Sequence, residues 1–382
     1  MCKLLVIIFS FLSISIFANN QYEISLIEID HEFEQHIQVE AINDKGQLLG
    51  QYCNKQDEIF LFDAVEGLTI INTDHPIPYN NSYPIAFNNM GQVLGYALKP
   101  KLDNRDGCVY YCYFPFMWNR ALGIQWLDVF NSSYILAHDL NDLGQVIGTY
   151  LPDQDYKEPL FDIFEFGRPF LWDNRMATDL GVGSEFSNSI ETFGYHIMEI
   201  NLERINNKGE MVGFFAFGKY NKKKNKYVKS GLNYFFWDGE MHVITLPKDN
   251  QNKRFKIVKV NNNGVVLISN DFNTTYLWDK QNDLRRVKYF SGVDINDSNV
   301  LLGTSISDNF GIPYKKAIWK DGNIFTLEKL LGVKDIGHID YSYSDSIVIE
   351  DIYTMNNKGQ IQCDGSIKGV SHLFFLNPVT TE

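Results

Sequence analysis

One eight-residue phrase recurs along the chain and constrains the fold more than any other feature. NDKGQLLG at 43–50 returns as NNMGQVLG at 88–95 and as NDLGQVIG at 141–148. Aligned on the first Asn, the sequence holds seven copies, which begin at Asn43, Asn88, Asn141, Asn206, Asn261, Asn296 and Asn356. The copies recur on average every ~52 residues, a period typical of a repeat array such as a solenoid or a propeller.

The chemistry of this phrase predicts a hairpin turn at every copy. An apolar residue precedes each first Asn, N-[N/D]-x-G follows in most copies, and apolar residues resume two positions after the Gly. The Asn side chain can accept a backbone N–H two residues on, and Gly supplies a positive φ. The sixth copy has Asn299 in place of this Gly, and Asn is the best substitute in that conformation. A calcium loop is the alternative, but the phrase lacks acidic residues at alternating positions and a terminal Glu.

A second phrase follows each turn and predicts the rest of the repeat. It reads IFLFD, PFMWN, PFLWD, YFFWD, TYLWD, KAIWK and HLFFLN, and another apolar stretch comes after a short turn. Each repeat therefore offers four short strands. Seven such repeats predict an all-β chain folded as a seven-bladed β-propeller of four-stranded antiparallel blades. The alternative, a solenoid of parallel coils, would need shorter and more uniform repeats without paired hairpin turns.

The two ends of the chain predict how the propeller closes. The last repeat ends at HLFFLNPVTTE and has no room for a fourth strand, whereas YEISLIEI at 22–29 is a strand with no repeat of its own. We expect this N-terminal strand to complete the last blade and close the ring. Residues 19–382 are then a single β-propeller domain of seven repeats.

Residues 1–18 have the pattern of a secretory signal peptide. Lys3 precedes an apolar run from Leu4 to Ala18, and the polar NNQYE follows, so we expect cleavage near Ala18. An uncleaved membrane anchor is the alternative, but this run is shorter than the roughly 20 residues that a spanning helix needs. The sequence predicts a protein exported to the periplasm or the cell exterior, a mature monomer without a transmembrane span.

Composition and missing motifs exclude several classes of function. The net charge is −13 at pH 7, which disfavours a nucleic-acid partner because phosphate backbones are repelled. The sequence has no GxSxG elbow, HExxH, Walker loop or dinucleotide fingerprint. We therefore assign no catalytic residue, no metal ligand and no cofactor.

Four cysteines remain after the predicted cleavage, namely Cys53, Cys108, Cys112 and Cys363. Cys108 and Cys112 form a possible disulfide, but only if the segment CVYYC turns, because an extended strand would hold them too far apart. A metal site is the weaker alternative, since no second Cys/His pair with ligand spacing accompanies them.

The pairing of the two phrases resembles the HAF repeat, which is found in many predicted extracellular bacterial proteins. The resemblance rests on AIN-x-x-GQ-like and FLWD-like segments and covers essentially the whole mature chain. It implies export and a propeller-like repeat fold, and it brings no chemistry or catalytic residues. Copies five and seven depart most, because Ile268 and Cys363 stand where five other copies have a strand Gly.

The longest connections predict where a ligand binds. Residues 97–114, 151–168 and 215–232 fall between the second and third strands, and residues 181–194 and 328–345 fall before the next first strand. All five are expected as irregular insertions on one face, and such one-sided elaboration commonly carries a binding surface. The candidate ligand-binding residues in these loops are Asp103, Arg105, Asp106, Tyr110, Tyr111, Tyr113, Asp153, Asp155, Tyr156, Glu185, Tyr341 and Tyr343.

Tyr-rich loops of mixed charge suit recognition of a glycan or a protein ligand, and solvated loops without a ligand are the plainer alternative. The sequence favours a binding or interaction module. A carbohydrate-active enzyme, a hydrolase or lyase on the same scaffold, is a second hypothesis, because a pair of carboxylates brought together in space leaves no sequence signature. A third is an envelope scaffold without a small ligand.

Overall fold

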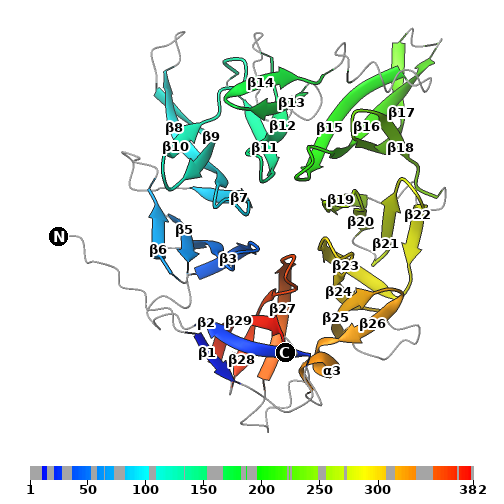
Figure 1. Cartoon of the computed structure of the whole chain (residues 1–382). Helices are drawn as coiled ribbons and strands as arrows, with labels where there is room; N and C mark the ends of the chain where they lie inside the picture. Colours follow the sequence, from blue (N-terminus) through cyan, green and yellow to red (C-terminus); the bar gives the residue numbers. More distant parts are fainter. Residues whose placement is uncertain are drawn as a thin grey trace. The chain divides into compact units, whose positions relative to one another are not determined.

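The fold is a seven-bladed β-propeller whose blades are four-stranded antiparallel sheets, as the repeats predict (Figure 1). The computed structural model describes residues 11–14, 21–27, 37–52, 58–63, 65–72, 82–102, 109–132, 134–152, 167–181, 186, 196–221, 223, 226–247, 255–270, 273–306, 315–332, 347–367 and 370–379. The chain divides into two compact units, and the division runs through the fifth sheet. Unit 1 is Met1–Asn72, Ser269–Tyr276 and Arg286–Glu382, and unit 2 is Thr73–Ile268 and Leu277–Arg285.

Blades are numbered here in chain order. In unit 1, blade 1 is β3 (Ile37–Ile42), β4 (Leu48–Tyr52), β5 (Glu58–Asp63) and β6 (Gly67–Ile71); blade 6 is β23 (Phe290–Ile295), β24 (Leu301–Ser305), β25 (Lys315–Lys320) and β26 (Asn323–Thr326), followed by helix α3 (Leu327–Leu331); blade 7 contains β27 (Ile347–Met355), β28 (Ile361–Ile367) and β29 (Val370–Pro378).

Unit 2 holds blades 2 to 4 and most of blade 5. Blade 2 is β7 (Tyr83–Phe87), β8 (Val93–Leu102), β9 (Val109–Asn119) and β10 (Gly123–Trp126); blade 3 is β11 (Ile135–Leu140), β12 (Val146–Tyr150), β13 (Arg168–Asp173) and β14 (Met176–Asp179); blade 4 is β15 (His196–Ile205), β16 (Met211–Asn221), β17 (Lys226–Trp237) and β18 (Met241–Ile244); blade 5 is β19 (Phe255–Val260), β20 (Val266–Asn270), β21 (Thr275–Asp279) and β22 (Asp283–Val287).

The N-terminal strand completes blade 7, which confirms the predicted closure. β2 (Tyr22–Ile27) pairs antiparallel with β29, from Tyr22 opposite Pro378 to Ile27 opposite Leu373. A short strand β1 (Phe11–Ile14) adds to the outer edge of β2. It lies inside the predicted signal peptide, so cleavage near Ala18 would leave blade 7 with four strands.

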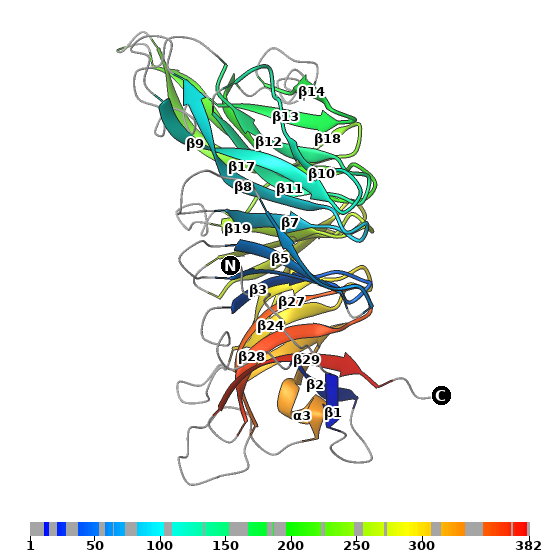
Figure 2. The same cartoon turned by 90° about the vertical axis from the view of Figure 1, so that its left-hand side faces the viewer.

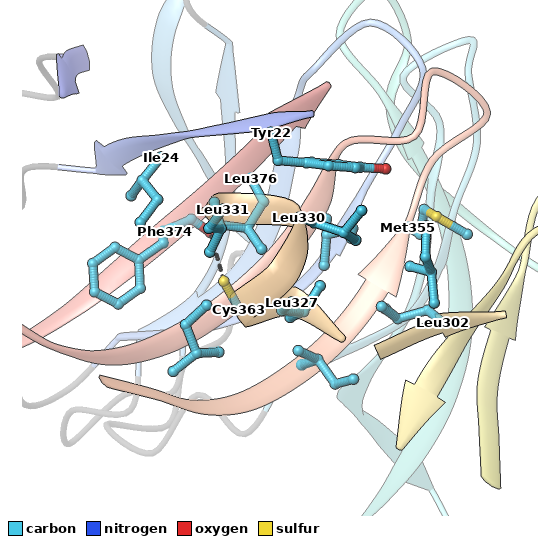
Figure 3. Packing of buried hydrophobic residues seen from close by; sticks show 14 of the residues in the cluster. Tyr22, Ile24, Leu302, Leu327, Leu330, Leu331, Met355, Cys363, Phe374 and Leu376 are labelled. Atoms are coloured by element: carbon cyan, nitrogen blue, oxygen red, sulfur yellow. Dashed lines mark hydrogen bonds between the residues drawn. The ribbon is translucent and has the colours of Figure 1, made fainter. Parts of the chain in front are cut away.

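Helix α3 fills the space beside the closing strand. Its Leu327, Leu330 and Leu331 are buried in one cluster with Tyr22 of β2 and Phe374 of β29 (Figure 3). Cys363 of β28 lies in the same cluster as a free thiol that contacts the Phe374 carbonyl, and burial raises its pKa. Apolar burial of Tyr22 and Ile24 against α3 therefore helps to hold the N-terminal strand in place.

The first Asn of each turn phrase does more than close its own turn. In blade 3, Asn141 Oδ1 accepts the backbone N–H of Leu143 at 3.1 Å and of Gln145 at 3.0 Å, as the sequence predicts in part. Asn141 Nδ2 also donates to the Asn206 carbonyl of the next blade at 2.9 Å. The same bond to a neighbouring blade is made by Asn88, Asn206 and Asn356, the last of which reaches Asn43.

Gln links the two repeated phrases, a role that the sequence did not reveal. Gln145 Oε1 accepts from Asn141 Nδ2 at 2.8 Å, and Gln145 Nε2 donates to Asp173, the last residue of FLWD, at 3.1 Å. Gln47 with Asp63, and Gln360 with Asn377, repeat this link. In these three blades each phrase supplies a hydrogen-bond partner of the other, whereas copies four to six have Glu210, Val265 and Val300 in place of this Gln.

Two insertions predicted as irregular are regular β-structure, so that prediction was wrong. β8 pairs with β9 out to Leu102 opposite Val109, and β16 pairs with β17 out to Asn221 opposite Lys226. These hairpins extend blades 2 and 4 beyond the length of the other blades (Figure 2). Strand pairing continues because both hairpins are rich in aromatic residues, which favour strands, as in VYYCYF and FFAFGKY.

Candidate functional site

Most of the predicted ligand-binding residues lie outside the described residues, namely Asp103, Arg105, Asp106, Asp153, Asp155, Tyr156, Glu185, Tyr341 and Tyr343. The possible Cys108–Cys112 disulfide falls outside them too, because Cys108 does. Tyr110, Tyr111 and Tyr113 all lie on the extended part of β9, opposite Lys101, Pro100 and Leu98. The side chain of Tyr113 is described, and it leads to an aromatic site that the sequence showed only in part.

The two ends of each blade are distinguished by the connections that they carry. The turn end carries the N-[N/D]-x-G turns and the turns between the third and fourth strands, and the insertion end is opposite. Three tyrosines stack at the insertion end of blade 2. The Tyr83 ring centroid lies 5.2 Å from that of Tyr96 and 5.4 Å from that of Tyr113. Tyr83 and Tyr113 are 39% and 40% exposed, so two of the three rings face solvent.

The buried member of this stack joins blade 2 to blade 3. Tyr96 accepts a hydrogen bond from the Ala137 backbone N–H at 2.6 Å and donates to the Ile135 carbonyl at 3.3 Å. Burial raises the pKa of Tyr96 well above its ordinary value, and burial, together with the nearby Tyr113, raises that of Tyr83. These phenols stay protonated at physiological pH. The exposed rings therefore rest on a fixed, neutral support.

A fourth aromatic residue reaches solvent from the connection between blades 2 and 3. Phe130 is 46% exposed and has φ of 53°, in the left-handed region that large side chains rarely adopt. Asn131 follows at φ of 55°, and its N–H binds Asp128 Oδ1 at 3.0 Å. Such a backbone costs about 1–3 kcal/mol and persists only where its surroundings impose it, which is common at ligand-binding positions.

The ring of Phe130 packs on Tyr150 of blade 3, which is linked to the tyrosine stack through the backbone of Ile135. Its centroid lies 4.9 Å from that of Tyr150, and Tyr150 stands opposite Ile135 in the sheet, the residue whose carbonyl Tyr96 binds. Burial, followed by the nearby Asp179 carboxylate, raises the pKa of Tyr150 to about 12. The aromatic site is defined here as Tyr83, Tyr96, Tyr113, Phe130 and Tyr150, with three rings exposed and two beneath them.

Sequence reasoning found Tyr113 but missed Tyr83 and Phe130. Tyr83 immediately precedes an apolar run and looks like any strand residue, while Phe130 sits in DVFNSS with no marker of its left-handed backbone. The cluster Asp-x-x-Asn-Ser is a turn signal. It gives no information on which side chain the turn exposes.

A second feature missed by the sequence is a β-bulge at one fixed position. In each of the six blades whose first and second strands have a described register, the residue three before the turn Asn is unpaired. The bulged residues differ widely in chemistry and are all at least partly exposed: Glu40, Ile85, His138, Glu203, Val293 and Tyr353. Bulges re-aim side chains and are enriched beside functional sites.

The bulge in blade 7 brings an aromatic hydroxyl among carboxylates. Tyr353 donates to Asp364 Oδ2 at 2.7 Å, and Asp364 Oδ1 accepts the Asp351 backbone N–H at 2.8 Å. Lys316 Nζ lies 2.8 Å from Asp351 Oδ1. Burial, then the bond to Asp364 and the charges of Asp364, Asp351 and Glu40, raises the pKa of Tyr353. The hydroxyl is therefore a held proton donor, not a phenolate nucleophile.

The described residues contain no group of three His, Cys, Asp or Glu side chains placed to hold a metal ion. Within the same part of the chain, no helix is both long and apolar enough to cross a membrane.

Solved structures with a similar fold include peptidases. A prolyl endopeptidase structure is 9% identical over 91% of this chain and 50% of its own, with a TM-score of 0.51. The acylaminoacyl peptidase of Pyrococcus horikoshii is 14% identical over 90% of this chain and 53% of its own, also with a TM-score of 0.51. A polysaccharide lyase, an ulvan lyase, matches with a TM-score of 0.41 at 10% identity, over 89% of this chain and 91% of its own.

The chain spans about half the length of the two peptidases that it matches, and at these identities the likeness shows the propeller fold alone. No family model matches the sequence, and no curated protein matches it. The resemblance to the HAF repeat stays a prediction.

Proposed function

We propose that this chain is an exported propeller that binds a glycan through the aromatic site of blades 2 and 3. One observation carries the proposal: of three exposed rings, Tyr83 and Phe130 each pack on a buried tyrosine, and Tyr113 packs on Tyr83. The apolar faces of sugar rings pack on aromatic faces, and phenol hydroxyls bind sugar hydroxyls. Rigid rings also lose little conformational entropy on binding, which favours affinity.

Export supports the choice of ligand. The run from Leu4 to Ala18 behind Lys3 fits a signal peptide, and the HAF-like repeats imply an extracellular or periplasmic protein. Glycans are abundant in both places. A protein ligand at the same insertion end is the second possibility, since exposed Tyr residues are also enriched in protein interfaces.

The test is a glycan and polysaccharide binding array with the mature protein, followed by calorimetry on each hit. We expect Tyr83→Ala, Tyr113→Ala and Phe130→Ala each to weaken binding by about tenfold or more, as central aromatic contacts do. Tyr289→Ala is the matched control, because Tyr289 is a 51% exposed tyrosine in the connection between β22 and β23. Binding that survives all three substitutions would contradict the aromatic site. An array without a hit would contradict a glycan ligand and favour a protein one.

A carbohydrate-active enzyme is the second candidate, and the blade 7 bulge favours it. Asp364 accepts a hydrogen bond from the Tyr353 hydroxyl, and the charges of Asp351 and Glu40 act on the same group. Glycoside hydrolysis needs two carboxylates near the scissile bond. Product analysis on each glycan that binds separates the two functions. Smaller sugars that appear with the wild type and vanish with Asp364→Asn would support hydrolysis, whereas binding without products would support a module that only binds.

A further inference from the structure

Four large apolar side chains stand exposed at the turn end of blades 2 and 3, away from the aromatic site. Met90 and Leu143 occupy the third position of the N-[N/D]-x-G turns, and Leu122 and Met176 lie at the turns between the third and fourth strands. Their exposed fractions run from 62% to 71%. Exposed apolar groups gathered in one region mark an interaction surface. These four residues are called the apolar tips below.

The turn itself does not require apolar residues at these positions. The other five turn phrases place Lys45, Lys208, Asn263, Ser298 and Lys358 where blades 2 and 3 have Met90 and Leu143. The turns hydrogen-bond alike in both groups, with the N–H of this residue bound to the first Asn. Since the polar choice serves the fold equally well, the apolar tips have another role.

Hydrogen bonds join the turns that carry three of the tips, Met90, Leu143 and Met176. Asn89 donates from its backbone and its side chain to Asp142, at 2.7 Å and 3.0 Å, which joins the turn of Met90 to that of Leu143. Gln145 Nε2 binds Asp173 at 3.1 Å and so joins the turn of Leu143 to that of Met176. These three tips therefore stand on a rigid platform, and placing them at a surface costs little ordering entropy.

The exposed charges beside the tips are positive. Arg120 and Arg175 lie on the same two turns as Leu122 and Met176, and both are exposed. The carboxylates of this platform, Asp142 and Asp173, are half-buried and accept hydrogen bonds from neighbouring amides. A surface that pairs apolar tips with guanidinium groups complements anionic lipid head groups above an acyl interior.

We propose that the turn end of blades 2 and 3 docks this protein on an anionic membrane surface. Met90, Leu122, Leu143 and Met176 enter the head-group layer, and Arg120 and Arg175 bind phosphates. The tips project singly from four separate turns, so lipid can surround each of them, whereas a protein partner would need a pocket for each. The net charge of −13 opposes approach to an anionic membrane, so docking relies on the two local arginines and on the apolar tips.

The test is co-sedimentation of the mature chain with vesicles of phosphatidylcholine alone or mixed with phosphatidylglycerol. We expect the wild type to sediment with the mixed vesicles. The double variant Leu143→Ser and Met176→Ser should bind these vesicles about tenfold or more weakly, because it loses two apolar side chains that would transfer into lipid. Arg120→Gln with Arg175→Gln should lower binding to mixed vesicles and weaken its salt dependence. Lys358→Ser, at the equivalent turn position of blade 7, is the matched control and should leave binding unchanged.

Two results would overturn the proposal. One is a wild type that stays in the supernatant with both kinds of vesicle; the other is sedimentation that both double variants retain in full. If the wild type does not bind lipid but captures a protein, and the same variants abolish that capture, the surface serves a protein partner instead. All three variants change exposed residues, so thermal melting checks that each is folded. Glycan binding uses different residues, and its failure would leave this proposal standing.

Discussion

Asn occupies the first position of all seven turns because that position needs a donor and an acceptor at once. In Asn356, Oδ1 accepts two backbone N–H groups of its own turn, and Nδ2 donates to the Gln360 side chain and to the Asn43 carbonyl of a neighbouring blade. An Asp side chain has no N–H group to donate, and a Ser or Thr side chain is too short to reach the same partners. The second position is either Asn or Asp. Both have a side-chain oxygen that can accept the backbone N–H of a neighbouring turn, as Asp44 and Asp142 do.

Replacing one such Asn tests this double role. Asn356→Asp keeps the acceptor but turns a carboxylate oxygen toward the Asn43 carbonyl and Gln360 Oε1. We expect a loss of about 2–4 kcal/mol in the free energy of unfolding, because buried acceptors lose their donor. Chemical denaturation measures it, with the exposed Lys358→Ala of the same turn as the control. A loss no larger than that of the control would mean that the bond to the next blade contributes nothing.

Asp139 gives a residue-level prediction that depends on pH. Burial raises the pKa of this carboxyl, although Arg204 and the Ile205 N–H, at 2.9 Å, oppose the shift. A raised pKa means that the folded state favours the neutral acid, so stability falls as pH rises from the unfolded pKa through the folded one. Asp139→Asn should therefore be more stable than the wild type at neutral pH and equal to it below about pH 3.5. The measurement is the denaturation midpoint of both proteins at the two pH values. A difference between Asp139→Asn and the wild type that is the same at both pH values would contradict the raised pKa.

At the scale of the element, the strand Gly of the phrase is explained by the bulge. A Cβ on Gly148 would lie 2.1 Å from the Leu136 carbonyl oxygen and 2.7 Å from the Phe170 ring, because the bulge at His138 brings the first strand onto the second. In blade 7 the close approach moves to Gly365, whose added Cβ would lie 1.8 Å from the Val348 carbonyl oxygen. A second bulge at Glu350 accompanies this shift. Cys363 can then stand where other blades have Gly.

Gly148→Ala tests the bulge directly. The clash is with backbone, which cannot rotate away, so we expect a loss of about 1–3 kcal/mol or more in the free energy of unfolding. Thr178→Ala, an exposed change on β14 of the same blade, is the control for urea denaturation. An unchanged midpoint for Gly148→Ala would show that the first strand can move aside.

Sequence periodicity predicted the elements well and the site poorly, for physical reasons. N-[N/D]-x-G and FLWD are local signals, so all seven hairpins and the third strands were found. A bulge leaves no trace in a period of two, and the Gln145–Asp173 bond joins residues 28 positions apart. The aromatic site depends on which rings meet, such as Tyr83 with Tyr113 across 30 residues. Spatial meetings of this kind cannot be read from a single chain.

At the scale of the whole molecule, the fold depends on joining residues from its two ends. β2 and β29 pair across more than 340 residues of sequence, and Tyr22 and Ile24 are buried against α3 and β28. Closing so long a loop lowers the conformational entropy of the chain, and the free energy of these contacts must offset that cost. The N-terminal strand is therefore the part of the chain on which cooperativity most depends.

A shortened chain would measure that dependence. We expect the chain 28–382, which lacks β2, to melt at least about 5 °C below the chain 19–382, because blade 7 loses its fourth strand and α3 loses its apolar cover. The chain 19–382 already lacks β1, so the comparison isolates β2. Calorimetry gives the melting temperatures, and the single substitution Ile24→Lys should reproduce part of the effect in a full-length mature chain. Equal melting curves for the two chains would mean that β29 tolerates an open edge and that closure is not what stabilises this propeller.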